Sequence, residues 1–303
     1  MTSVLITGAA GAIGTALCKR LEASTHDTVG IDAVKPRFSH NVPIETCDLH
    51  SSPSLPESDI IVHLAAHARV PPIINNPSLA FENVALLEPV LEHARRTNAH
   101  VIFVSSREIY HNAINAREDD VPQRQANPYG ASKLAGEALL TSYRETYAVP
   151  TTVLRLSNVY GPYDENTRVL PIFISLADAG EKLKVFGSRK LLDFVHSKTV
   201  TEVIERIINK PQTFDGEVVN VGSGQGTTLT ELAERVVNEV SPCPGYEVVE
   251  GREGETTRYV ANIERFQSLF NLSPDTLDKR LPEVIDWYRS HPAVLADIRS
   301  QIR

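Results

Sequence analysis

The amino-acid sequence predicts an α/β protein with a doubly wound parallel sheet and a smaller, mostly C-terminal α/β domain. Short apolar runs alternate with amphipathic segments up to about residue 156, which is typical of parallel sheets covered by helices. After about residue 162 this alternation becomes irregular. We therefore expect a first domain in residues 1–165, an interwoven second domain in residues 166–303, and segments near 190–222 that return to the first.

Composition argues against several classes of protein. The 303 residues include 30 basic and 38 acidic side chains, a net charge of −8, which disfavours a nucleic-acid or anionic-membrane surface. Cys18, Cys47 and Cys243 are far apart and form no CxxC pair, so we expect neither disulfides nor a metal site. No run of about 18 apolar residues occurs. We expect a soluble, cytoplasmic protein without nucleic-acid or membrane partners.

A glycine-rich turn near the N-terminus predicts a dinucleotide site. It follows a short apolar strand and opens an amphipathic helix, the context that gives this motif its meaning. Gly8 permits a tight turn, Gly11 lets the backbone approach a pyrophosphate, and Gly14 allows close packing of helix on strand. Backbone N–H groups at the start of the helix, at Ala12 and Ile13, carry partial positive charge for the phosphates. The arrangement predicts a Rossmann domain.

An acidic residue ends the second predicted strand, residues 28–32. Asp32 lies about 20 residues after the glycine turn, where a carboxylate accepts hydrogen bonds from the ribose hydroxyls and repels a 2′-phosphate. This favours NAD as the cofactor. Lys35 and Arg37 lie close enough in sequence to keep NADP open, and an ordinary surface aspartate is the alternative for Asp32.

Two further strands extend the predicted cofactor site. Residues 44–49 form a third strand whose end, Asp48 and Leu49, we expect at the adenine, although Asp48 alone is equally typical of a turn. Residues 60–66 form a fourth strand, and its small C-terminal residues let a cofactor lie against the backbone. The residues expected to do so are Leu64, Ala65 and Ala66.

The surroundings of the fourth strand contain two histidines of different character. His63 lies in an apolar run and is expected in the core. His67 and Arg69 follow the strand, at the edge where open α/β sheets bind ligands, and we expect them to line the site. A helix is predicted over residues 78–96, kinked by Pro89. Its apolar stripe comprises Phe81, Val84, Leu87 and Leu91.

Tyr129 and Lys133 lie four residues apart, on one face of a predicted helix. A nearby cation favours the phenolate, so the pair can make a base. On its own the spacing is more typical of a solvated helix face. The fifth strand, residues 101–104, runs into Ser105 and Ser106 and so places hydroxyl groups at the same edge of the sheet.

The C-terminal half contributes one more strand of the main sheet and a mixture of other elements. The sixth strand is predicted at residues 151–156. Further helices are predicted at 169–179, 198–209, 229–240, 263–270 and 281–289, and strands at 191–195 and 218–221.

The glycine turn, Asp32, the serine pair, and Tyr129 with Lys133 stand in a fixed order that resembles the extended short-chain dehydrogenase/reductase family, in particular its NAD-dependent nucleotide-sugar epimerases and dehydratases. Other matching segments cover nearly the whole chain: residues 63–66, 127–133, 155–162, 193–195, 220–224 and 252–255. The resemblance implies that Ser106 is the catalytic hydroxyl and Tyr129 the base. Lys133 would tune the base and hold the nicotinamide ribose.

The resemblance also implies a nucleotide-diphosphate sugar as substrate. Asn158 and Arg252 match positions that hold the diphosphate in relatives, although Arg252 also suits a solvated polar loop. Many relatives carry an arginine where this chain has Leu192. Arg168 or Arg189 is the candidate replacement for that missing cation.

The fate of the sugar after oxidation at C4 is less strongly specified. An epimerase returns hydride to the other face of the 4-keto sugar, a dehydratase removes the C5 proton and the C6 hydroxyl, and a decarboxylase releases carbon dioxide. 4,6-Dehydratases resemble one another in placing Asp then Glu after the catalytic hydroxyl, whereas this chain has Arg107 and Glu108. We therefore predict a 4-epimerase.

Three alternative functions stay open. The first is a dehydratase with Glu108 as its C5 base, and the second is a decarboxylase, because a Ser-Glu pair is also seen in that class. The third is a non-catalytic dinucleotide-sensing protein. Glu108 itself also has an ordinary interpretation, as an exposed loop carboxylate. The resemblance further implies a homodimer through the helices over residues 78–96 and 129–148.

Overall fold

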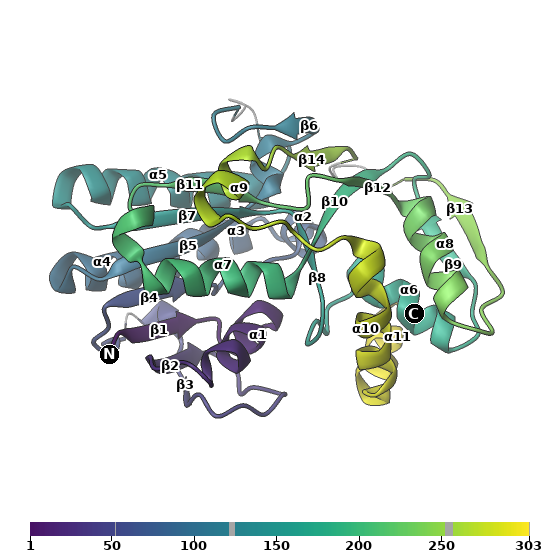
Figure 1. The fold of residues 1–303 in the computed structure, drawn as a ribbon, viewed down its shortest axis with the longest axis horizontal. Helices are drawn as coiled ribbons and strands as arrows, with labels where there is room; N and C mark the ends of the chain where they lie inside the picture. The colour runs from purple at the N-terminus through teal and green to yellow at the C-terminus, as the bar shows by residue number, and fades with distance from the viewer. Residues whose placement is uncertain (52, 121–124, 252–256, 303) are drawn as a thin grey trace.

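The computed structural model describes residues 1–51, 53–120, 125–251 and 257–302. Its central element is a seven-stranded parallel sheet in the order β11-β7-β5-β4-β1-β2-β3 (Figure 1). The strands are β1 (Ser3–Thr7), β2 (Asp27–Asp32), β3 (Ile44–Thr46), β4 (Ile60–His63), β5 (His100–Ser106), β7 (Thr151–Leu156) and β11 (Val218–Val221). The predicted doubly wound α/β fold is confirmed.

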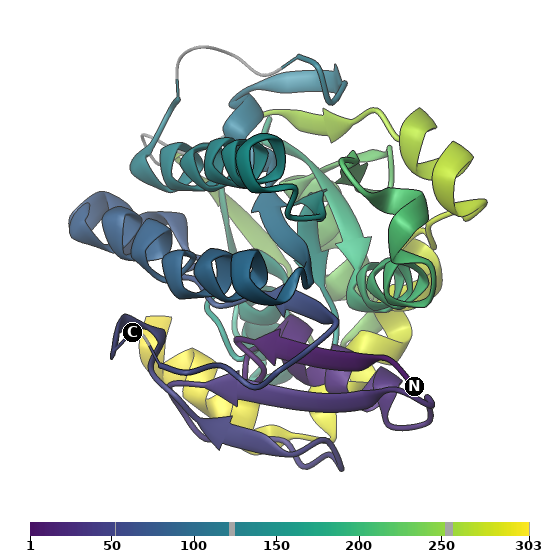
Figure 2. The same cartoon turned by 90° about the vertical axis from the view of Figure 1, so that its left-hand side faces the viewer.

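Helices cover both faces of this sheet (Figure 2). One face packs against α1 (Ala12–Leu21), α7 (Ser197–Asn209) and α9 (Glu264–Phe270), the other against α4 (Glu88–Thr97) and α5 (Pro128–Tyr147). Successive side chains of a strand point to opposite faces, and so Val4 and Ile6 pack toward α1 and α7 whereas Leu5 packs toward α4. Burial of both faces explains the short, continuously apolar runs in the sequence.

A second hydrophobic core lies in the C-terminal part of the chain, at the right of Figure 1. Its helices are α6 (Val169–Asp178), α8 (Leu229–Glu239), α10 (Leu277–Arg289) and α11 (Pro292–Ile302). Two small sheets, β12-β10-β8 and β13-β9, accompany them, and a third, β14-β6, belongs to a separate small core. Their strands are β6 (Ala113–Ala116), β8 (Asn158–Tyr160), β9 (Leu183–Phe186), β10 (Leu191–His196), β12 (Gly226–Thr228), β13 (Tyr246–Val249) and β14 (Tyr259–Ala261).

The helix predicted over residues 78–96 is two helices, α3 (Ser78–Ala85) and α4. Pro89 occupies the first turn of α4, where its missing N–H needs no partner, so the predicted kink is wrong. The predicted apolar stripe divides at the same point. Leu87 and Leu91 are buried, but Phe81 of α3 is 78% exposed.

Other differences are local. The third strand ends at Thr46, and Leu49 begins a 3₁₀ turn, η1 (Leu49–Ser51). Strand β6, which is not among the predicted strands, pairs with β14 from far along the chain. The remaining short helices are α2 (Val70–Asn75), η2 (Arg107–Tyr110) and η3 (Pro211–Phe214).

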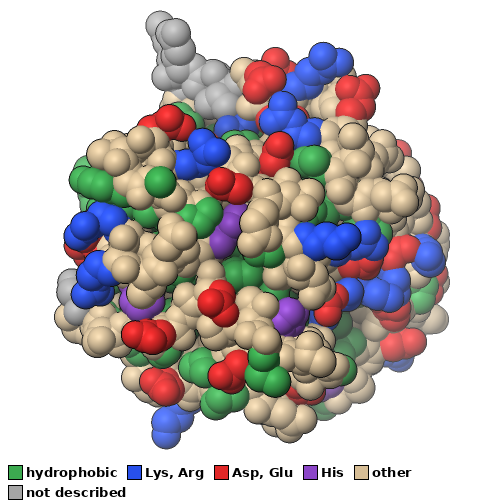
Figure 3. Space-filling model, turned by 60° about the vertical axis from the view of Figure 1, so that its left-hand side comes forward, with side chains coloured by type: hydrophobic (Ala, Val, Ile, Leu, Met, Phe, Trp, Pro, Cys, Tyr) green, Lys and Arg blue, Asp and Glu red, His purple; other side chains and the backbone are tan. Residues whose placement is uncertain are grey.

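The surface is mixed in charge. Figure 3 shows basic and acidic side chains interspersed on one face of the molecule. Within the described residues, no helix combines the length and the apolarity needed to cross a bilayer.

Three buried histidines are held in the neutral form. His100 bonds the Thr152 hydroxyl at 2.7 Å, and the His196 Nδ1 accepts the backbone N–H of Lys198 at 3.1 Å. Burial lowers the pKa of His63 to about 3 and the pKa values of His100 and His196 to about 4. An unfolded histidine titrates near 6.5, so the unfolded chain binds protons that the folded chain excludes as the pH falls below that value.

We therefore expect the free energy of unfolding to decrease between pH 7 and pH 5, by at most about 2 kcal/mol for each histidine. Urea unfolding followed by circular dichroism at the two pH values measures this change. His100→Gln removes one of the three groups, and its pH dependence should be smaller than that of the unmodified protein. An equal pH dependence would contradict the assignment.

Candidate active site

A cavity of about 1260 Å³ lies between the carboxyl ends of the parallel strands and the C-terminal part of the chain. Most of the predicted site residues line it: Gly8, Gly11, Ala12, Ile13, Gly14, Leu64, Ala66, Ser106, Glu108, Tyr129, Lys133, Asn158 and Arg168. Asp32, Asp48, Leu49 and Ala65 lie outside its lining. Arg252 is not among the residues that the structure describes.

The glycine turn is shaped so that a side chain would collide with the backbone. Gly8 has φ +71°, and a Cβ there would lie 2.6 Å from the nitrogen of Ala65; a Cβ on Gly14 would lie 2.3 Å from the Gly8 oxygen. Gly11 stands directly before α1 and lines the cavity, so no side chain covers the N–H groups of the first helical turn at that position. This cradle fits a pyrophosphate.

Asp32 ends β2 beside the glycine turn. Its carboxylate accepts the backbone N–H of Ala10 at 3.0 Å and that of Val34 at 3.1 Å. Arg37 is turned toward the C-terminal part, where it pairs with Glu165 and, at 2.7 Å, with Asp297. Its guanidinium is therefore engaged by two carboxylates.

The two residues expected at the adenine differ in their surroundings. The Asp48 carboxylate accepts the backbone N–H of His50 at 3.0 Å, as in a turn. Leu49 is 4% exposed and belongs to the core beneath α4. Its side chain therefore packs inward.

Tyr129 and Lys133 share one face of the first two turns of α5. The helix starts where it does because the Asn127 side chain accepts the N–H of Gly130 at 2.9 Å and Pro128 occupies the first turn. The Ser106 side chain lies next to the phenol of Tyr129 and lowers the pKa of that phenol. The Lys133 ammonium donates to the carbonyl of Val104 at 2.9 Å. Strand β5 and helix α5 thus place the three side chains together.

Burial and charge act in opposite directions on these groups. Burial raises the pKa of Tyr129, and the neighbouring Ser106 hydroxyl and the charge of Arg168 oppose this rise. Burial also lowers the pKa of Lys133 to about 8, against the charge of Glu137. Because its pKa lies above neutrality, the Lys133 ammonium remains mostly protonated at pH 7.

Glu108 is a buried ion-pair partner, so its interpretation as an exposed loop carboxylate is wrong. Its side chain is 6% exposed, and Oε1 lies 2.9 Å from the Arg107 guanidinium. Oε2 accepts the side-chain N–H of Asn127 at 3.0 Å. Both carboxylate oxygens are therefore engaged at the wall of the cavity.

Cations gather at the part of the cavity next to β8 and α6. Arg168 lies 3.7 Å from Asp164, and burial together with the charge of Arg168 lowers the pKa of Arg69. The Asn158 amide donates to the carbonyl of Asp193 at 2.9 Å. Arg189, the alternative to Arg168, is not among the lining residues. Two neighbouring arginines form a site that suits an anion.

A model of the NAD dependent epimerase/dehydratase family matches residues 4–222, more than half of the chain. The chain belongs to this family. The predicted resemblance is thereby confirmed, and with it NAD as the cofactor and an enzyme as the class of protein.

Relatives within the family catalyse more than one reaction. The dTDP-glucose 4,6-dehydratase of Streptomyces griseus is 27% identical over 314 residues, 96% of this chain and 95% of that protein. The UDP-glucose 4-epimerase of Thermus thermophilus, solved with NAD, is 25% identical with a TM-score of 0.85, covering 95% of this chain and 99% of that one. A UDP-N-acetylglucosamine 4-epimerase of Methanobrevibacter ruminantium is also 25% identical, with a TM-score of 0.86 and coverage of 96% and 99%.

Three lysines line the cavity in addition to the predicted residues: Lys182, Lys184 and Lys190. Lys182 and Lys184 flank the buried Leu183 at the start of β9. A strand that alternates basic and apolar residues presents its cations on one face. That alternation was the available sequence signal.

A buried ion pair that no sequence pattern indicated connects β7 with α5. Arg155 of β7 donates to the Glu137 carboxylate of α5 at 2.7 Å, and the two side chains are 6% and 8% exposed. Glu137 also accepts a hydrogen bond from the Ser105 hydroxyl. Since Ser105 precedes Ser106 and Glu137 lies one turn after Lys133, the pair joins the elements that carry the predicted catalytic side chains.

We expect Glu137→Gln to lower the free energy of unfolding by about 3 to 5 kcal/mol, because it leaves the Arg155 charge buried without its counter-ion. Urea unfolding of the variant measures the loss. Glu202→Gln is the matched control: Glu202 pairs with Arg206 at 2.9 Å on the surface of α7, and its loss should be below about 1 kcal/mol. Equal losses in the two variants would show that the buried pair contributes no more to the free energy of unfolding than the surface pair does.

Proposed function

We propose that the chain is an NAD-dependent nucleotide-diphosphate-sugar 4-epimerase. The observation that carries the proposal is the neighbouring pair of Ser106 and Tyr129, which lines the same cavity as the glycine cradle. The relatives described above include two nucleotide-sugar 4-epimerases.

The proposed roles follow from the positions of the groups. NAD, when bound, supplies an acceptor for the hydride of C4 and returns that hydride. The Tyr129 phenolate takes the proton of the C4 hydroxyl, and the Ser106 hydroxyl donates to the oxygen of the resulting ketone. Lys133 holds its ammonium beside the sheet through Val104. Return of the proton from Tyr129, after the sugar has turned its other face, completes a 4-epimerisation.

The same residues support epimerisation over dehydration. A dehydratase needs a free carboxylate to remove the C5 proton and an acid to protonate the departing C6 hydroxyl. Both oxygens of Glu108 are engaged, one by Arg107, which occupies the position where the resemblance expects that acid. Dehydration and decarboxylation within the same family are the alternatives, and the Streptomyces griseus relative supports the first of them.

The substrate would lie along the cation-rich part of the cavity. We propose that Asn158, Arg168 and Arg252 hold its diphosphate, that residues 1–165 with the returning segments near 190–222 bind NAD, and that residues 166–303 bind the sugar nucleotide. A cytoplasmic location agrees with the free thiols of Cys18 and Cys47.

Tyr129→Phe should lower the rate of C4 epimerisation by at least about 100-fold, because it removes the proton acceptor and leaves the ring in place. Purified protein incubated with NAD and a panel of UDP-, dTDP- and GDP-sugars, with products analysed by NMR, measures this rate. Tyr143→Phe is the matched control on the same helix, since Tyr143 lies near the C-terminal end of α5 and bonds Glu92 at 2.6 Å.

A 4-keto-6-deoxy product would replace the epimerase by the dehydratase. No product from any sugar nucleotide, with NAD bound, would favour the non-catalytic dinucleotide-sensing alternative. Unchanged epimerisation by Tyr129→Phe would refute the assigned base.

We propose that the protein is a homodimer that pairs α3 and α5 with their symmetry mates. Phe81 of α3 is 78% exposed. On α5 the exposed Ala131, Ala135 and Ala138 recur at helical spacing. Apolar surface on two adjacent helices suits a four-helix interface between two copies.

Phe81→Asp should therefore convert the dimer to a monomer, because a charge would be buried at the centre of the interface. Size-exclusion chromatography with light scattering measures the mass. Val248→Asp is the control, since Val248 is 51% exposed on β13. A wild-type protein that runs as a monomer at every concentration would exclude the dimer.

A further inference from the structure

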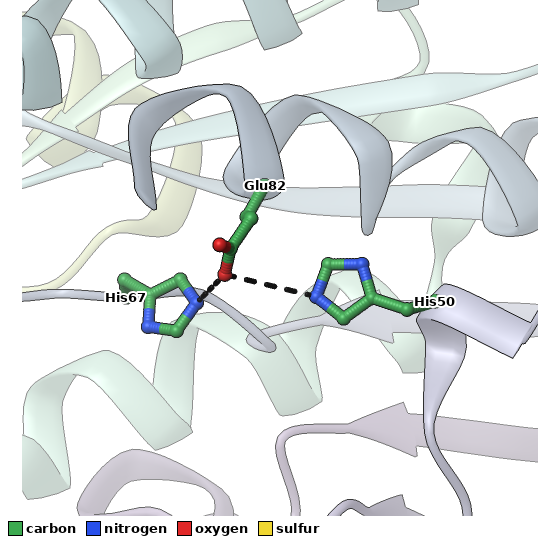
Figure 4. Close-up of side chains that lie close together, drawn as sticks. All are labelled: His50, His67 and Glu82. Atoms are coloured by element: carbon green, nitrogen blue, oxygen red, sulfur yellow. Dashed lines mark hydrogen bonds and ion pairs between the residues drawn. The ribbon is translucent and has the colours of Figure 1, made fainter. Parts of the chain in front are cut away.

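Three potential metal ligands meet beside the cofactor side of the cleft: His50 in η1, His67 in the loop after β4, and Glu82 in α3. Figure 4 shows the two imidazole rings approaching the Glu82 carboxylate from opposite sides. The His67 Nε2 lies 2.8 Å from Oε2 of Glu82, and the His50 Nε2 lies 4.0 Å from the same oxygen. All three donor atoms lie within 4.8 Å of one another.

The distances between these donor atoms lie on either side of the distance expected between the ligands of a bound ion. Bonds of 2.0 to 2.2 Å to a tetrahedral ion place its donor atoms roughly 3.4 Å apart. The 2.8 Å contact is shorter than this and the 4.0 Å contact is longer. Small rotations of the side chains, without movement of the backbone, would bring the three donors around one ion.

Hydrogen bonds that do not use the donor atoms fix the backbone of two ligands. Asn83, next to Glu82, accepts the backbone N–H of His67 at 2.7 Å and donates to its carbonyl at 3.1 Å. The backbone N–H of His50 donates to Asp48 at 3.0 Å. Because these partners lie outside the donor set, an ion could bind without breaking them.

The chemical nature of the three donor atoms favours some metal ions over others. Two imidazole nitrogens and one carboxylate oxygen suit Zn²⁺, Ni²⁺, Co²⁺ or Cu²⁺, whereas Mg²⁺ and Ca²⁺ prefer oxygen ligands alone. The three side chains are 39%, 41% and 39% exposed, which leaves a path for the ion and room for water as its fourth ligand.

We propose that His50, His67 and Glu82 form a binding site for a divalent transition-metal ion of the Zn²⁺ type. The bound ion links the loops at the carboxyl ends of β3 and β4 to helix α3, beside the glycine-turn half of the cleft. The site revises the expectation of no metal. That expectation rested on cysteine spacing, and these ligands are 17 and 15 residues apart (50 to 67, 67 to 82). The proposal is independent of the reaction proposed above.

Untagged protein, treated with a chelator and dialysed, should bind one Zn²⁺ per chain in calorimetric titration and bind Mg²⁺ much more weakly. His67→Ala and Glu82→Gln should each weaken Zn²⁺ binding by at least about 10-fold. His26→Ala is the control: His26 bonds Asn209 at 3.1 Å, away from the cluster, and its loss should leave Zn²⁺ binding unchanged. Zn²⁺ should also raise the unfolding temperature of wild type and of His26→Ala only.

Wild-type affinity for Zn²⁺ in both His67→Ala and Glu82→Gln would overturn the site, as would equal affinity of the wild type for Zn²⁺ and Mg²⁺. Should His67→Ala fail to fold, His50→Ala provides the same comparison, since the His50 ring is 39% exposed and η1 is a surface turn. His50→Ala binding as tightly as wild type would then reduce the cluster to a His67–Glu82 ion pair.

Discussion

The buried ion pair between Arg155 and Glu137 is the interaction on which the geometry of the site depends. Its charges lie where water cannot reach them, so the pair is tolerable only because its hydrogen bonds are complete. Arg155 also donates to the Tyr110 hydroxyl at 2.7 Å and to the carbonyl of Glu118 at 2.5 Å. Glu137 accepts from Ser105. The network locks α5 against β5 and β7 in one register, and that register sets the contact between the serine and the tyrosine of the site.

The features that the sequence predicts correctly are those set by interactions within one short segment of the chain. The glycine turn, the strand that precedes it and the first helix form one continuous segment, so their spacing alone specifies the geometry. Contacts between residues far apart in the sequence were not predicted. No pattern near Glu137 indicates Arg155, 18 residues on (137 to 155), and nothing near Ala113 indicates its pairing with Tyr259. The end of the third strand also differs, because the strand stops at Thr46 and the Leu49 side chain packs in the core; the position of Leu49 at the adenine stays a prediction.

Side chains of the loop that follows Asp32 connect the core of the main sheet to the second hydrophobic core. Phe38 in this loop packs against Tyr163 and Trp287 with ring centroids 5.2 and 5.5 Å apart. Arg37 adds its ion pairs to Glu165 and Asp297. The segment that begins at the predicted ribose-binding aspartate is thus fixed to α10 and α11.

The electrostatic surroundings of the tyrosine bear on its proposed role as a base. Burial raises the pKa of Tyr129, although the neighbouring Ser106 hydroxyl and the charges of Arg168 and Arg107 oppose this rise. The phenol is therefore mostly protonated in the protein alone at neutral pH, and further positive charge beside it would be needed to favour the phenolate. The cavity that the phenol faces also contains the glycine cradle, and NAD held there would bring such a charge on its oxidised ring. In the proposed reaction, loss of the phenol proton would therefore be favoured when the oxidant is bound.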